Sequence, residues 1–138
     1  MSAPHPFPRR VLLAVTGLSP QTVTETLYAL ARATPAFLPT EIHLLTTAEG
    51  ARLARAALLH TDGGQFHALL ADYPALGHPA FDEESIHIIT DAEGQPLADI
   101  RSPADNAAAA DAITALVAEL TRDDNAALHV SIAGGRKT

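Results

Sequence analysis

The segment 11–21 reads Val-Leu-Leu-Ala-Val-Thr-Gly-Leu-Ser-Pro-Gln, and it decides the fold class of the chain. Its first five residues form a continuous apolar run, which is typical of a strand buried on both faces of a parallel sheet. Ser19 and Pro20 suit the N-cap and the first position of a helix. Apolar residues then recur at helical spacing, at Val23, Leu27 and Leu30. The pattern therefore predicts a strand, a short loop and an amphipathic helix over about 20–33.

The same alternation of strand and helix continues along the chain. Further strands are predicted at 41–47, 85–91 and 128–132, with a short edge strand at 95–100. Helices are predicted at 48–60, at 66–73 and from a capping box at Ser102 to about Arg122, and the acidic stretch 82–84 is predicted to be a loop. Strands that alternate with helices indicate an α/β fold with a mostly parallel sheet flanked by helices.

Composition limits the function classes that fit the chain. Its 138 residues suit a single domain, and its net charge of -7 disfavours a grip on long nucleic acid, although a small anionic ligand remains compatible. There are no cysteines, so disulfides and thiolate metal sites are excluded and a reducing cytoplasm is expected. The sequence contains neither an apolar signal region nor an apolar run long enough to span a bilayer.

Two loops are the candidate ligand site, because ligands of parallel sheets bind beyond the carboxyl ends of the strands. The first covers 16–21. The second, 133–138, reads Ala-Gly-Gly-Arg-Lys-Thr and combines a glycine turn with Arg136 and the only lysine, Lys137. A capped turn and a solvated basic end are the simpler alternatives for the two loops. Both loops follow strands, so we expect them at one edge of the sheet, where they would share an anion pocket.

Known catalytic motifs do not fit these residues. A Walker A motif needs adjacent Gly and Lys, whereas Arg136 separates Gly135 from Lys137. The Gly-x-Gly-x-x-Gly and Gly-x-Ser-x-Gly patterns are also absent. His43, His87 and His129 lie in predicted strands, where their side chains need not converge, so neither a metal site nor a cofactor is predicted.

A weaker candidate lies at the start of the predicted helix that begins near Ser102. Arg101 and Asn106 are polar side chains at this helix start, and either could reach a ligand. The alternative is that the segment only caps the helix and forms a local pair between Arg101 and an aspartate, which would contribute little stability.

Several of these segments together resemble the CRISPR-associated Rossmann-fold (CARF) family. They are the segment 11–21, Thr-Glu-Thr-Leu-Tyr-Ala-Leu at 24–30, Asp-Ile-Arg-Ser-Pro-Ala-Asp-Asn at 99–106, and His-Val-Ser-Ile-Ala-Gly-Gly-Arg-Lys-Thr at 129–138. The resemblance implies a Rossmann-like domain over 10–138 behind a flexible tail at 1–9. Members of the family usually continue after Gly-Gly-Arg-Lys-Thr into a helix and further strands, so we expect this domain to be truncated at its C-terminus.

The family is similar to the ring nucleases of type III CRISPR systems. These are homodimers that bind cyclic oligoadenylate, typically cyclic tetra-adenylate, and many cleave it to switch off the antiviral signal. The resemblance implies catalytic roles for Lys137 and Ser19, in a metal-independent attack of the ribose 2′-hydroxyl that leaves a 2′,3′-cyclic phosphate. The implied ligand-binding residues are Thr16, Gly17, Leu18, Gln21, Gly134, Gly135, Arg136 and Thr138, with Arg101 and Asn106.

Two other functions stay open at this point. One is a non-catalytic sensor of cyclic oligoadenylate that regulates a partner or an effector. The other is a nucleotide-binding Rossmann-like protein unrelated to CRISPR, which would prefer mononucleotides.

Overall fold

One parallel sheet organises the computed structural model, which describes residues 8–16, 21–33, 36–59, 64–77, 79–124 and 126–132. Its strand order is β3-β2-β1-β4. The strands are β1 (Arg9–Val15), β2 (Glu41–Thr46), β3 (Ile86–Ile88) and β4 (Ala126–Ile132). β1 lies at the centre, where Val11, Leu12 and Leu13 are fully buried because helices cover both faces. The predicted α/β fold with a parallel, Rossmann-like sheet is confirmed.

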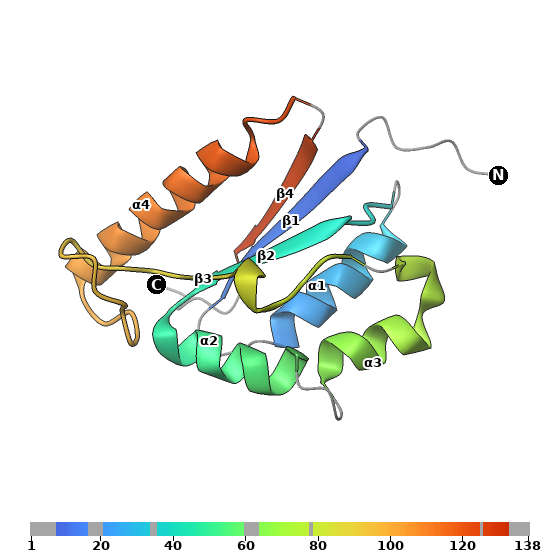
Figure 1. The fold of residues 1–138 in the computed structure, drawn as a ribbon, viewed down its shortest axis with the longest axis horizontal. Coiled ribbons are helices and arrows are strands. Elements are labelled where there is room, and N and C mark those ends of the chain that lie inside the picture. The colour runs from blue at the N-terminus through green and yellow to red at the C-terminus, as the bar shows by residue number, and fades with distance from the viewer. Residues whose placement is uncertain are drawn as a thin grey trace.

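The helices form a layer on each face of the sheet (Figure 1). One layer contains α1 (Gln21–Arg32), α2 (Ala48–Ala54) and α3 (Gln65–Asp72), and the other contains α4 (Pro103–Leu120). Successive β1 residues point to opposite faces, so Leu12 joins the core under α1–α3 and Leu13 joins the core under α4. None of the described helices is long and apolar enough to cross a bilayer.

Four local predictions differ from the structure. The strand predicted over 85–91 is shorter, since β3 covers only Ile86–Ile88. The helix predicted over 48–60 is α2, which continues as a π-helical turn over Arg55–Leu59. The strand predicted at 95–100 is a single antiparallel bridge between Thr90 and Pro96, because proline has no N–H to extend a ladder. The loop predicted at 82–84 runs into a short 3₁₀ helix, Glu83–Ser85, capped by Asp82.

One of the two hydrogen bonds of the capping box predicted at the start of α4 is present. The Ser102 hydroxyl accepts a hydrogen bond from the backbone N–H of Asp105 at 3.1 Å. The carboxylate of Asp105 accepts from the N–H of Arg101 at 2.9 Å, one residue before the partner that a full capping box requires. Pro103 occupies the first turn, so the helix begins where the sequence places it.

Removal of this cap is expected to weaken the fold measurably. Ser102→Ala leaves the N–H of Asp105 without its partner and should lower the free energy of unfolding by about 1 kcal/mol in urea. Thr114→Ala, an exposed position on the same helix, should change it by less than about 0.5 kcal/mol. Equal stability of the two variants would contradict a capping role for Ser102.

Candidate functional site

The candidate site is the carboxyl edge of the sheet between β1 and β4. These two strands pair in register over their whole length, and Val15 lies opposite Ile132 at their ends. The loops predicted to bind ligand, 16–21 and 133–138, therefore follow two neighbouring strand ends. The expectation that the strands leading into both loops end at one edge of the sheet is confirmed.

The order of the strands singles out this same position. From β1 the chain moves outward to β2 and then to β3, whereas β4 lies on the opposite side of β1. The connections from β1 to β2 and from β2 to β3 run through α1 to α3 on one face of the sheet. The connection from β3 to β4 runs through α4 on the other face. Such a reversal is a topological switch point, and open α/β sheets bind ligands in the crevice beyond the strands there.

The end of β2, in contrast, is closed by the chain itself. The N–H groups of Ala48 and Glu49, at the start of α2, donate to the carbonyls of Leu97 and Ala98 at 2.7 Å and 3.3 Å. The next N–H, of Gly50, donates to the hydroxyl of Thr47. An anion would have to displace these bonds to reach the start of α2, so the β1–β4 end is the better candidate.

Thr16 directly follows β1 and is buried, with 6% of its surface exposed. Its backbone N–H donates to the carbonyl of Leu45 at 3.1 Å, which fixes the first residue of the predicted loop 16–21 to β2. Gln21 is the first residue of α1. The described part of the chain thus anchors both ends of the segment 17–20.

Arg101 and Asn106 are exposed at the beginning of α4. This beginning lies at the carboxyl edge of the sheet, because Asp123, beyond the other end of α4, pairs with Arg9 at the amino end of β1. The local pair expected for Arg101 is present, with Nε 3.6 Å from Oδ2 of Asp99. Both candidates are therefore at the predicted edge, and their ligand-binding role stays a prediction.

The other predicted site residues lie outside the described residues, and their roles likewise stay predictions. They are Gly17, Leu18, Ser19, Gly134, Gly135, Arg136, Lys137 and Thr138.

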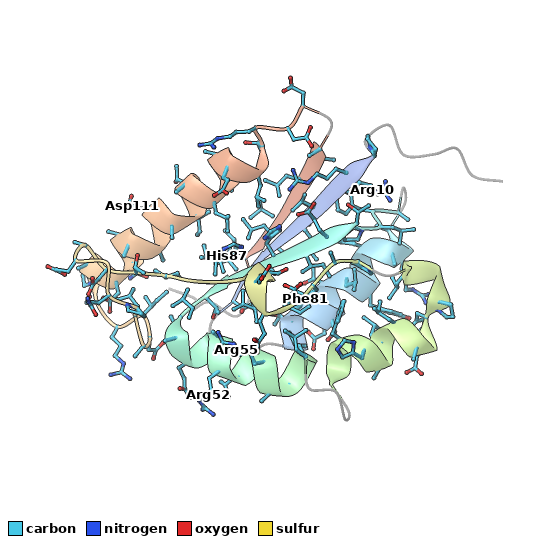
Figure 2. The ribbon with its side chains drawn as sticks, in the orientation of Figure 1. Arg10, Arg52, Arg55, Phe81, His87 and Asp111 are labelled. Carbon is cyan, nitrogen blue, oxygen red and sulfur yellow. The ribbon has the colours of Figure 1, made fainter. Side chains whose placement is uncertain are left out.

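A shallow depression elsewhere does not compete with this edge. Its volume is about 450 Å³ and it lies between the π-helical turn, α3 and the segment 81–83, beside Arg55 and Phe81 (Figure 2). Its charged rim contains Arg55 and Glu83, which pair with each other at 4.0 Å. None of its lining residues belongs to β1 or β4.

The sequence interpretation missed one polar contact. His43 and His87, which were not expected to converge, lie with Nδ1 and Nε2 2.9 Å apart. The parallel pairing of β2 and β3 puts both on the face under α4. The sequence does contain a sign of this contact, because the stretches Ile-His-Leu-Leu-Thr at 42–46 and Ile-His-Ile-Ile-Thr at 86–90 are similar and each places a histidine at the same position. Within the described ranges, no group of three His, Cys, Asp or Glu residues could hold a metal ion.

Comparison with known proteins supplies the family. The family model described as CRISPR-associated protein NE0113 matches residues 19–138. No curated protein and no solved structure gives a significant match. The family match covers most of the chain, including α1 to α4, β2 to β4 and the segment after β4. The chain therefore belongs to the family of CRISPR-associated protein NE0113.

Proposed function

We propose that the chain binds a cyclic oligoadenylate, most simply cyclic tetra-adenylate, at the carboxyl edge between β1 and β4 and cleaves it. The observation that carries this proposal is the switch point at which Val15 and Ile132 end side by side. Membership of a CRISPR-associated family supports it. The sequence also resembles CARF proteins of type III CRISPR systems, whose messenger is cyclic oligoadenylate.

The chemistry of the two loops suits a phosphodiester. Backbone N–H groups around Gly134 and Gly135, with the side chains of Arg136 and Lys137, would bind the phosphate. Cleavage without metal requires the ribose 2′-hydroxyl to be held in line with the neighbouring phosphorus, together with a cation that stabilises the charge developing on the phosphoryl oxygens. Lys137 would supply that cation, and Ser19 would orient the ribose and phosphate.

A homodimer follows from the symmetry of the proposed ligand. A cyclic tetranucleotide can present the same groups twice, related by a two-fold axis, and a two-fold protein can match both sets with one kind of loop. The mass of the protein with and without ligand, measured by light scattering after size exclusion, checks this part of the proposal.

The deciding experiment is incubation of the full chain with cyclic tetra-adenylate in EDTA, followed by chromatography of the products. Linear product that ends in a 2′,3′-cyclic phosphate is expected. Tight binding without any product would overturn the cleavage step and support a non-catalytic sensor. Preference for mononucleotides over the cyclic ligand would overturn the proposal as a whole.

A further inference from the structure

A hydrogen-bonded chain of polar side chains crosses three strands on the face of the sheet that α4 covers. Arg9 Nε on β1 lies 2.5 Å from Glu41 Oε1, and Glu41 Oε2 lies 2.8 Å from His43 Nε2 on β2. His43 Nδ1 lies 2.9 Å from His87 Nε2 on β3, and the two rings stack with centroids 5.2 Å apart. Most of this face is apolar, so a polar chain here needs its own explanation.

The direction of each hydrogen bond follows from the carboxylate. The pKa of Glu41 is lowered, mainly by the hydrogen bond from Arg9, so the group is ionised near neutral pH and only accepts. His43 therefore donates from Nε2 to Glu41. In a neutral His43 the other nitrogen, Nδ1, carries no hydrogen and accepts the Nε2–H of His87. Both rings are thus fixed as Nε2–H tautomers.

The pair has room for one added proton and not for two. A single added proton still leaves one hydrogen between the facing nitrogens, whichever ring carries the charge. A second proton would place an N–H on His43 Nδ1 and on His87 Nε2, and atoms 2.9 Å apart cannot both donate toward each other. The two rings would also both be positive. Full protonation must therefore separate the rings.

The surroundings show what such a separation would move. The side chains of His43 and Glu41 are only 18% and 23% exposed, and Figure 2 shows His87 on the side of the sheet that α4 covers. The negative charge of Glu119 on α4 acts on His87, and Arg9 links Glu41 to Asp123 beyond the end of α4. β3 pairs with β2 through three residue pairs, and the histidine contact adds a side-chain link between the same two strands.

We propose that the His43–His87 pair is a proton-sensitive clamp that holds the β3 edge and the end of α4 on the sheet, and that a second added proton opens it. This inference is independent of the proposed nuclease function. Burial lowers the pKa of His87 below 6.5, the charge of His43 lowers it further, and Glu119 offsets part of this change. The unfolded chain therefore binds this proton more readily, so the stability that the neutral pair contributes is fully present above pH 6.5 and is lost as the pH falls below it.

Thermal unfolding of the full chain at about pH 7.5 and about pH 5.5 tests the clamp in two variants. In His87→Gln, the amide can still donate to His43 and does not take up a proton. Between these conditions, the Tm of the parent should fall by about 3 to 6 °C more than that of His87→Gln. His67→Gln, which replaces an exposed histidine on α3, is the matched control and should follow the parent.

An equal loss of Tm in the parent and in His87→Gln would overturn the clamp. A rise in the Tm of the parent on addition of zinc chloride, lost in His87→Gln, would instead assign the pair to a metal site. If His87→Gln does not fold, ¹⁵N spectra of the parent histidine rings give the answer. Two Nε2–H tautomers at neutral pH, with α4 signals that change only at the second protonation, are expected. Independent titration with unchanged α4 signals would contradict the proposal.

Discussion

Lys137→Ala is expected to slow the cleavage of cyclic tetra-adenylate by about 10²- to 10³-fold, because the variant loses the cation that would stabilise charge on the phosphoryl oxygens. Binding should weaken far less, since the proposal also assigns phosphate binding to Arg136 and to the backbone of the glycine turn. The rate is measured by single-turnover cleavage with the enzyme in excess, and affinity by filter binding. The proposed division between chemistry and binding requires that the rate fall much more than the affinity.

Arg52→Ala is the matched control for charge. Arg52 is an exposed cation on α2, where it pairs with Glu49, and it lies outside the candidate site. Its removal changes the net charge by the same amount as Lys137→Ala and should leave the cleavage rate unchanged. Lys137→Arg keeps the positive charge and should retain part of the activity. Parental activity in Lys137→Ala would assign the transition-state cation to another residue.

The strand that starts near Val11 and the helix that ends near Arg32 could be predicted closely because their signals are local. The apolar run that starts at Val11 corresponds to the buried part of β1, and Val23 and Leu27 are fully buried in α1 as their spacing predicts. Ser102 also caps α4 as expected. Each signal depends on residues within two helical turns of each other, which is the range over which sequence periodicity is informative.

The order of the strands could not be read from the sequence. Alternating elements predict a parallel sheet, but they do not state that β4 lies beside β1 and not beside β3. That order is what turns two separate loops into one candidate site, since it places Val15 opposite Ile132. It depends on which apolar faces are covered by α1–α3 and which by α4, and this is a property of the whole core.

The contacts that the sequence did not predict join residues far apart in the chain. The carbonyls of Leu97 and Ala98 close the start of α2 across a long stretch of sequence, and no periodic pattern marks them. The contact of His43 with His87 likewise requires the register of β2 and β3, because a shift of one residue would put the rings on opposite faces. The predicted residues after Ile132 lie outside the described part of the chain, so their roles depend on the proposed experiments.

Leu27→Ala is expected to cause the largest loss of stability among the substitutions considered, about 3 kcal/mol of the free energy of unfolding. Leu27 is fully buried on α1 and belongs to the core that also contains Leu12 of β1 and Leu44 of β2. Alanine lacks the isopropyl group of the leucine side chain and leaves a cavity that the two strands can fill only in part. Because domains of this kind are stable by only about 5–15 kcal/mol, the change is measurable by urea unfolding.

The same substitution tests how the first loop is positioned. Leu27 attaches α1 to the sheet, and α1 begins directly after the segment 17–20, so loss of this contact should loosen the loop that carries Ser19. Leu30→Ala on the same helix is the matched control, since Leu30 is only partly buried and should cost clearly less. At a temperature where Leu27→Ala remains folded, the variant should bind cyclic tetra-adenylate more weakly than Leu30→Ala does. Equal stability and equal affinity in the two variants would show that α1 does not hold the loop through Leu27.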